Sequence, residues 1–328
     1  MKLFALLCTA AAVSIFCACQ KEDTPQAPAP APSATLTKKA VEFNVGGFVQ
    51  NVGDFRTVPG GSKTRRDSLL ATKISFLFYF AYDSLGNEVR MIYQNVSDAN
   101  DFGVIKDSLA PGSYTIVFMG TTDTPAGFGG SGLNDPETQN AHTPLASAGM
   151  PLRSTGVLSL YPVPNAYYKK FPLTVSSTDA PAVTNVSLER IVGKIEVNVL
   201  DAVPQNAPNE TTVTINPESV FFGFGSGSSS VLPGDVISRS ISRVSPTQFS
   251  ELVLNTETPF SVTIKYTGYY SGLTTEKTIH NVRCYKNKRT ILTGLLFDVP
   301  PGDSTATGGR FEAQVNDVWD PNDEVINF

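Results

Sequence analysis

Few side chains in this sequence are spaced for catalysis. The two histidines, His142 and His280, lie far apart along the chain, and neither is next to a nucleophile motif. Residues 127–132 match a G-x-G-x-x-G phosphate-binding fingerprint by letter, but an Asn-Asp-Pro segment follows where that motif needs a helix. The acidic residues at 317–324 lack the spacing of an EF-hand loop. Because catalysis needs several groups in mutually placed roles, we predict no enzymatic activity, no metal site and no cofactor.

The residue best placed for covalent modification is Cys19. It follows Lys2 and an uncharged apolar run over residues 3–16, whose 14 residues are too few for a hydrocarbon core that needs about 20. With Ala18 directly before it, Cys19 resembles the acylated cysteine of a bacterial lipoprotein. The Lys and two acidic residues at 21–23 resemble a signal for the outer surface of Bacteroidota. We therefore predict a signal peptide at 1–18, lipid on Cys19 and a location on the outer face of the outer membrane.

Two alternatives stay open for this segment. Cys17 could carry the lipid instead, although the bulky Phe16 before it fits the cleavage pocket of a lipoprotein signal poorly. The chain could also be an ordinary secreted protein, with Cys19 unmodified. In the lipoprotein prediction Cys8 and Cys17 leave with the signal, so Cys284 has no partner for an intramolecular disulfide. We expect Cys284 to be a small buried residue.

The charge of the chain argues against nucleic acid as a partner. The sequence has 25 Lys and Arg against 30 Asp and Glu, a formal net charge of −5. Phosphate binding requires clustered Lys and Arg, which an acidic chain with 17% charged residues does not offer. Binding or assembly with other proteins is therefore favoured.

The chain after the signal is predicted to be all-β. Residues 19–39 are rich in Pro and Ala, cannot bury a core, and are expected to form an extended tether. Beyond them, short stretches rich in β-branched and aromatic residues recur at intervals of roughly 8–12 residues between turn signals, which is typical of β-sandwiches. A prior of about 150 residues for each domain favours two domains. We place an N-terminal sandwich at 40–189 and a C-terminal sandwich at 190–328.

One predicted strand is apolar on both faces. Residues 74–82 read ISFLFYFAY, so neither set of alternate side chains is polar. Such a strand is expected at the centre of a sheet that is covered on both sides. A turn signal at 83–87 and a second apolar stretch at 89–93 predict that it is followed by a hairpin partner.

Two further segments are candidates for a role in assembly. A Gly-containing segment between the first strand and the central strand carries Arg56, Arg65 and Arg66, and exposed loops of this kind are preferred sites of proteolytic cutting. Basic residues in such a loop more often only contact solvent. An alternating strand and an apolar close occupy residues 311–328. A terminal strand usually completes its own sheet.

These segments, in this order, resemble the fimbrillin superfamily, the subunits of the type V pili of Bacteroidota. The resemblance runs over the whole chain: the lipoprotein signal, the tether, the first strand, the Arg-containing segment, the aromatic strand with its turn, and the segments at 111–117, 188–195 and 315–319. It implies two tandem transthyretin-like β-sandwiches. It also implies a structural subunit of a cell-surface fimbria that supports adhesion.

The resemblance further implies assembly by strand exchange. An Arg-specific surface protease would cut after Arg66, Arg65 or Arg56, and the first strand would leave. Other pilus subunits would then bind by β-strand complementation, in which a strand of the next subunit fills the vacated groove. The released strand would carry Val41, Phe43, Val45, Phe48 and Val49. The candidate donor strand carries Phe311, Val315, Val318, Val325, Ile326 and Phe328.

Two other functions remain as alternatives. The same superfamily contains anchor subunits that are not cut and keep their lipid, and the predicted signal and tether fit that role equally. A surface glycan-binding lipoprotein also uses tethered β-sandwiches, and it would need exposed aromatic platforms. The aromatic residues that are candidates for such platforms are Trp319, Tyr167 with Tyr168, and Tyr269 with Tyr270.

Overall fold

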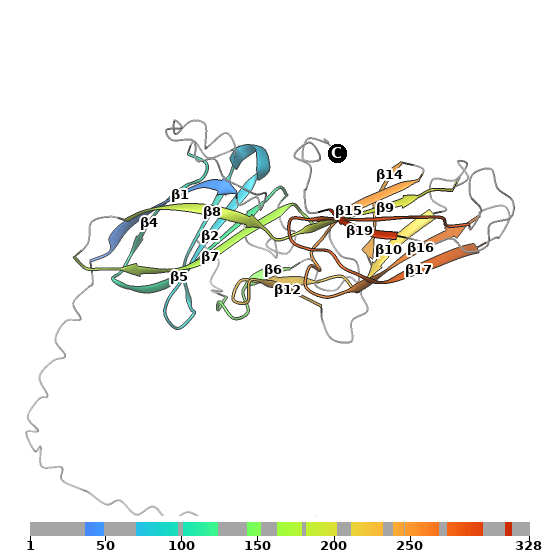
Figure 1. Ribbon diagram of the computed structural model, residues 1–328. Coiled ribbons are helices and arrows are strands. Elements are labelled where there is room, and N and C mark those ends of the chain that lie inside the picture. Colours follow the sequence, from blue (N-terminus) through green and yellow to red (C-terminus); the bar gives the residue numbers. More distant parts are fainter. Residues whose placement is uncertain are drawn as a thin grey trace, which may run out of the picture. The chain divides into compact units, whose positions relative to one another are not determined.

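The protein is almost entirely β-structure. The computed structural model describes residues 37–48, 70–97, 101–123, 143–151, 163–178, 182–201, 211–231, 239–245, 247–268, 274–297 and 312–316. Within these ranges the chain forms β-strands and one helical turn at residues 70–73 (Figure 1). The all-β prediction is therefore confirmed. No helix in the described ranges is long and apolar enough to cross a membrane.

The first nine strands in chain order supply the sheet that contains the aromatic strand. They are β1 (Lys39–Phe48), β2 (Phe76–Tyr82), β3 (Glu88–Asn95), β4 (Val104–Leu109), β5 (Gly112–Thr121), β6 (Gly149–Pro151), β7 (Ala166–Val175), β8 (Ala182–Arg190) and β9 (Gly193–Val199). Seven of them form one sheet in the order β3-β2-β5-β7-β8-β1-β4, and β6 and β9 belong to other sheets.

This seven-stranded sheet folds over on itself between β7 and β8. These two strands pair only through Tyr167 with Arg190 and Tyr168 with Glu189. The layer β3-β2-β5-β7 therefore faces the layer β8-β1-β4, and the two share one apolar core. The core takes alternate side chains from both layers, among them Phe43, Tyr79 and Phe118.

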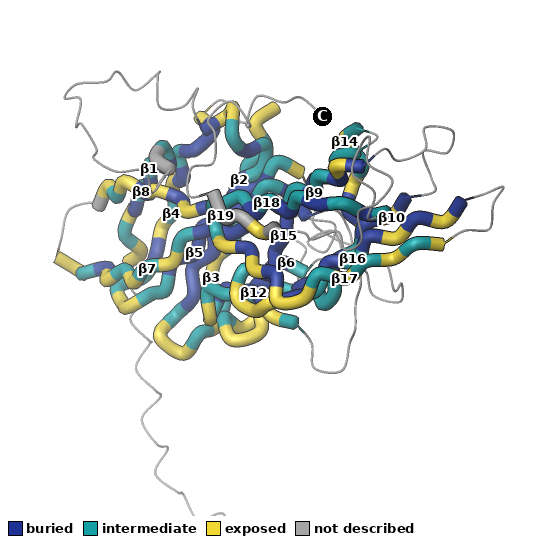
Figure 2. Tube along the Cα trace, turned by 45° about the vertical axis from the view of Figure 1, so that its right-hand side comes forward, coloured by how far each residue is buried: buried dark blue, intermediate teal, exposed yellow. Residues whose placement is uncertain are grey.

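β2 is covered on both faces, as its sequence predicted. Leu77, Tyr79 and Ala81 enter the sandwich core, whereas Phe78, Phe80 and Tyr82 enter a second apolar cluster on the other face. The second cluster also contains Met150, Phe222 and Phe224. These three residues lie on or directly beside a three-stranded sheet of order β12-β11-β6, with β11 at Phe221–Gly223 and β12 at Ser228–Ser230. Six of the seven residues of β2 are buried, and Figure 2 marks the buried residues along the chain in dark blue.

The remaining strands, together with β9, form two sheets that face each other. They are β10 (Thr211–Asn216), β13 (Arg239–Ser240), β14 (Arg243–Ser245), β15 (Gln248–Val253), β16 (Phe260–Thr267), β17 (Thr274–Val282), β18 (Arg289–Gly294) and β19 (Glu312–Asn316). One sheet has the order β13-β10-β16-β17 and the other β14-β15-β9-β18-β19. Their inner side chains make a further apolar core that includes Val197, Ile264 and Leu292. Cys284 is buried in this core, as the sequence predicted.

The chain passes from β8 to β9 through a buried arginine. The side chain of Arg190 is 5% exposed. Its guanidinium donates to the hydroxyl of Tyr167 at 2.6 Å and to the Oδ1 atom of Asn287 at 3.1 Å. Tyr167 belongs to β7 of the seven-stranded sheet, and Asn287 precedes β18 of the five-stranded sheet. The Arg190 guanidinium therefore connects segments that belong to two different sheets.

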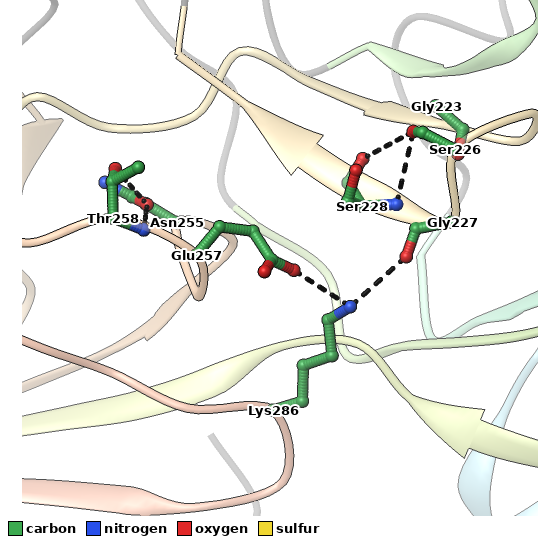
Figure 3. A network of polar contacts seen from close by, with 8 residues as sticks. All are labelled: Gly223, Ser226, Gly227, Ser228, Asn255, Glu257, Thr258 and Lys286. Carbon is green, nitrogen blue, oxygen red and sulfur yellow. Dashed lines mark hydrogen bonds and ion pairs between the residues drawn. The ribbon is translucent and has the colours of Figure 1, made fainter.

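The turn between β11 and β12 is held by side chains from elsewhere in the chain. The Tyr168 hydroxyl donates to the carbonyl of Phe224 at 2.5 Å. The Lys286 ammonium donates to the carbonyl of Gly227 at 3.2 Å and pairs with Glu257 at 2.9 Å (Figure 3). These contacts satisfy carbonyls that the short hairpin cannot pair itself, and they fix the small sheet over β2.

Candidate functional site

The predicted first strand is an interior strand of the fold. β1 pairs with β4 in antiparallel register, for example Phe43 with Ile105, and with β8 in parallel register, Phe43 with Thr184 (Figure 1). Its two edges are therefore both occupied by backbone hydrogen bonds. We call the position between β4 and β8 that β1 fills the β1 slot.

The inward side chains of β1 are almost fully buried. Val41, Phe43 and Val45 are 5%, 0% and 2% exposed. Phe48 is the last residue of β1, and Val49 lies outside the described residues. The alternate residues Glu42 and Asn44 are only partly buried. β1 thus presents one apolar face to the core, with a large ring in its centre and a β-branched side chain on each side.

Phe43 sits in a socket of three aromatic rings. The centroid of its ring lies 5.3 Å from that of Tyr79, 5.5 Å from that of Phe118 and 6.2 Å from that of Phe171. All three socket residues come from the opposite layer, on β2, β5 and β7. Tilted and edge-on rings at these distances attract each other beyond the effect of area burial. Phe43 therefore joins the two layers at the middle of the β1 slot.

The end of β1 approaches a glycine closely. The amide of Val45 donates to the carbonyl of Gly103 at 2.8 Å, and Gly103 has a φ of +97°. A Cβ atom at position 103 would lie 2.7 Å from the carbonyl oxygen of Val45. A side chain would therefore clash there and would also strain the backbone, so glycine is required for this approach.

A buried carboxylate lies beside β1 on β4. The side chain of Asp107 is 4% exposed. Its Oδ1 atom lies 3.3 Å from Nε of Arg90 on β3, and its Oδ2 atom accepts a hydrogen bond of 3.1 Å from the Tyr79 hydroxyl. Burial raises the pKa of the Tyr79 hydroxyl above its usual range, and the nearby Asp107 carboxylate raises it further. Tyr79 therefore stays a neutral donor to Asp107.

A shallow groove opens where β1 begins. It has a volume of about 630 Å³ and is lined by Lys38, Val41, Val89 and Lys106, among others. Lys38 is exposed, whereas Val41 further along is buried. The burial of the chain thus begins within the first residues of β1.

Most of the other predicted site residues fall outside the described ranges. These are Cys19 for lipidation, Arg56, Arg65 and Arg66 for cleavage, and Phe311, Val318, Val325, Ile326 and Phe328 of the candidate donor strand.

Val315 is the one candidate donor residue whose backbone is described. It lies in β19, which pairs with β18 in antiparallel register, Thr290 with Val315. β19 is the outermost strand of its sheet in the described part of the chain. Residues 312–316 thus complete a sheet of their own chain, so their use as a donor requires that this pairing open or that residues beyond it take the role.

One of the candidate aromatic platforms is buried. Tyr167 and Tyr168 are 3% and 8% exposed, and both hydroxyls make hydrogen bonds within the chain. A sugar cannot stack on rings that are covered in this way. Trp319, Tyr269 and Tyr270 lie outside the described residues.

A comparison with protein families decides the affiliation. The model of the family described as fimbrillin-A associated anchor proteins Mfa1 and Mfa2 matches residues 56–235, which is more than half of the 328 residues. The chain belongs to this family. The resemblance to fimbrillins found in the sequence is thereby confirmed, and the chain is a fimbria-associated protein.

One solved structure of a fimbrial protein has a similar fold, and a second is reported as a match only. The fimbrial anchor protein Mfa2 from Porphyromonas gingivalis is 13% identical, with a TM-score of 0.52, over 85% of this chain and 98% of that one. A fimbrial assembly protein from Parabacteroides distasonis is 10% identical, with a TM-score of 0.45, over 85% and 99% of the two chains. At such identities the likeness concerns the fold. A search of curated proteins found no match.

Sequence patterns missed the part of the slot that β4 provides. β4 carries only two apolar inward residues, Ile105 and Leu109, and the charged Lys106 and Asp107 stand between them. An inward-facing acid breaks the alternation that identifies a strand. Asp107 lies midway between Ile105 and Leu109. An acid at that spacing was the available signal for β4, but the pattern is too common to identify a strand alone.

Proposed function

We propose that this member of the Mfa1 and Mfa2 family is a structural subunit of a cell-surface fimbria that is exported as a lipoprotein and assembled by strand exchange at the β1 slot. The observation that carries the proposal is the position of β1. The first strand of the chain lies between β8 and β4, with its inward side chains in the centre of the core. Its removal would expose a continuous apolar groove with free backbone groups on both sides.

The proposed assembly has three steps. Lipid on Cys19 holds the chain at the outer face of the outer membrane. An Arg-specific surface protease hydrolyses the peptide bond after Arg66, Arg65 or Arg56, which separates β1 from the rest of the chain. A strand from another pilus subunit then enters the slot, where backbone hydrogen bonds give affinity and alternate apolar side chains fill the groove. The C-terminal segment at 311–328 is the proposed donor.

A second candidate function is an uncleaved, lipid-bound fimbrial anchor. The description of the matching family as anchor proteins favours it. In that role β1 stays in place and connects the lipid and tether to the folded body. Hydrogen bonds on both edges of β1 and the Phe43 socket would then resist extraction of the strand under load.

The two candidates differ in their dependence on the arginines. A triple variant with Arg56→Ala, Arg65→Ala and Arg66→Ala removes the proposed cleavage sites and leaves β1 untouched. If cleavage controls assembly, the variant reaches the cell surface as a lipoprotein but appears only as monomer when surface extracts are separated by size. Incorporation into fimbriae at the wild-type level would contradict the cleaved subunit and support the anchor. Lys63→Ala, in the same segment, is the matched control.

A further inference from the structure

β4 depends on β1 for all of its described strand pairing. It stands at the end of the seven-stranded sheet, with β1 as its neighbour. The pairing runs from Lys39 with Leu109 to Asn44 with Val104. If β1 leaves the slot, β4 therefore keeps no backbone ladder in the described part of the chain. If β4 is still to form one side of the slot, other contacts must hold it in place.

The side chain of Gln94 on β3 makes the first such contact. Its Nε2 atom donates to the carbonyl of Val104 at 2.9 Å, and its Oε1 atom accepts from the amide of Gly103 at 2.9 Å. One amide group thus bonds a donor and an acceptor of the backbone at the start of β4, as a neighbouring strand would. Gln94 belongs to the opposite layer, so these bonds do not involve β1.

The second contact is made by Asp107, in the middle of β4. Its carboxylate is held by Arg90 on β3 at 3.3 Å and by the Tyr79 hydroxyl on β2 at 3.1 Å. Hydrogen bonds to a charged group are stronger than neutral ones. Breaking this set would leave the almost fully buried carboxylate with the amide of Ser108, on β4 itself, which donates to its Oδ1 atom at 2.7 Å. We call the contacts of Gln94, Arg90, Tyr79 and Asp107 the β4 clasp.

The geometry of the strands gives the clasp a role. β4 is antiparallel to β1 and β1 is parallel to β8, so β4 has the direction needed to pair with β8 directly. An empty slot is about 9–10 Å wide, twice the spacing of neighbouring strands. Unpaired backbone groups on both walls favour its closure. A closed slot would have to reopen before any strand could enter.

We infer that the β4 clasp keeps the β1 slot open after β1 has left, so that the strand of a partner subunit enters a preformed groove. This inference rests on the proposed strand exchange and adds the residues that make the exchange fast. Binding to a preformed site avoids the cost of a conformational change and is correspondingly rapid. Gln94 and Asp107 are thus positioning residues, which act on the incoming strand through β4.

The test uses the full chain, purified in detergent and cut by trypsin between β1 and β2. N-terminal sequencing identifies the cut. Because the cut alone leaves β1 in place, β1 is removed on a sizing column in mild urea, and the urea is then diluted. A fluorescent synthetic peptide of residues 37–49 is added in excess to the emptied protein, and its association and dissociation rates are measured. The variants are Gln94→Ala and the conservative Asp107→Asn. Gln248→Ala is the matched control. Gln248 donates a similar hydrogen bond to Glu196, and both residues lie in the five-stranded sheet, which does not contain the slot. Circular dichroism of the uncut proteins checks that each variant is folded.

The account predicts that both variants lower the association rate of the peptide at least tenfold, whereas Gln248→Ala matches the wild type. If the clasp only stabilised the bound complex, the two variants would raise the dissociation rate of the peptide and leave its association rate unchanged. Association rates within twofold of the wild type in both variants would therefore overturn the inference and leave strand exchange intact. If the cut wild-type protein neither releases β1 nor takes up the peptide, strand exchange itself is overturned, and the role of the clasp with it.

Discussion

The ring of Phe43 on β1 lies 5.3 Å from the ring of Tyr79 on β2. These strands belong to opposite layers of the first sandwich, and the segment between them contains the three arginines that we propose as cleavage sites. The first strand of the chain is therefore bound to the rest by a packed core and two hydrogen-bonded edges. A peptide bond that is cut in between does not by itself release it.

Phe43 is expected to contribute strongly to stability because its ring is fully buried in the aromatic socket. Phe43→Ala should lower the free energy of unfolding by about 3–5 kcal/mol, since it removes a large buried side chain and leaves a cavity. Urea denaturation followed by tyrosine fluorescence measures this. Val183→Ala on β8, at a side chain that is 60% exposed, should change stability by no more than about 0.5 kcal/mol. Equal effects of the two changes would contradict the burial of β1.

Three buried tyrosines should make the protein unstable at alkaline pH. Burial raises the pKa values of Tyr79, Tyr82 and Tyr168 above the usual value of about 10. The folded state keeps these hydroxyls protonated where the unfolded state would lose the protons. Their contribution to stability is thus complete below about pH 10 and is lost as the pH rises further towards the folded-state pKa values. Unfolding at a series of pH values should show a steep fall above pH 10, and a flat profile up to pH 12 would contradict the prediction.

Removing one tyrosine hydroxyl at a time should show which of the three hydroxyls stabilise the folded protein. The hydroxyl of Tyr82 is buried and has no hydrogen-bond partner among the described residues, so Tyr82→Phe should be neutral or stabilising. Tyr79→Phe and Tyr168→Phe each remove a hydrogen bond, to Asp107 and to the carbonyl of Phe224. Each should cost about 1–3 kcal/mol, because a buried acceptor loses its donor. Thermal unfolding ranks the three variants, and a destabilising Tyr82→Phe would contradict the expected order.

Arg190 should be irreplaceable by lysine. Its guanidinium reaches the Tyr167 hydroxyl and Asn287 at the same time and also lies over the Tyr167 ring at 5.1 Å. A lysine ammonium cannot match this planar arrangement of donors. We expect Arg190→Ala to lower stability by about 3 kcal/mol and Arg190→Lys to recover less than half of that. The exposed Arg283→Ala is the control, and full rescue by lysine in urea denaturation would show that charge alone matters.

Some elements could be predicted from the sequence because one local property decides them. The residues of β2 are apolar at every position, which requires cover on both faces, and Asp83 makes the turn to β3 by accepting hydrogen bonds from the amides of Leu85 and Asn87. The buried position of Cys284 could be expected because a cysteine without a disulfide partner behaves as a small apolar residue. These features need no knowledge of distant contacts.

Other elements depend on contacts between residues far apart in the chain. β4 is a strand although Asp107 faces inward, because Tyr79 and Arg90 compensate the buried charge. β12 consists of three serines and pairs with β11 in the small sheet that covers β2. The sequence alone suggested only a connection there. The strand β1 could likewise be predicted from the sequence. The strands on its two sides could not, because β4 and β8 come from later parts of the chain.

The β1 slot should select strands with an aromatic residue at its centre. β1 places Val41, Phe43 and Val45 inward, with the aromatic ring at the central position. Loss of the ring costs about 3–5 kcal/mol in a buried site. In competition on the trypsin-cut protein, a peptide of residues 37–49 should therefore displace β1 at least 100-fold more effectively than the same peptide with Phe43→Ala. Equal potency would show that the socket does not select the strand.

In the proposed assembly, β1 leaves the chain when the fimbria forms. N-terminal sequencing combined with intact mass, on protein recovered from the cell surface, tests this most directly. The account predicts a chain that starts at Asp67, or at Arg66 or Thr57 if one of the other arginines is cut, with the mass of the remaining residues and no lipid. Lipid-modified Cys19 at the N-terminus of every molecule would contradict it and would assign the chain to the uncleaved anchors.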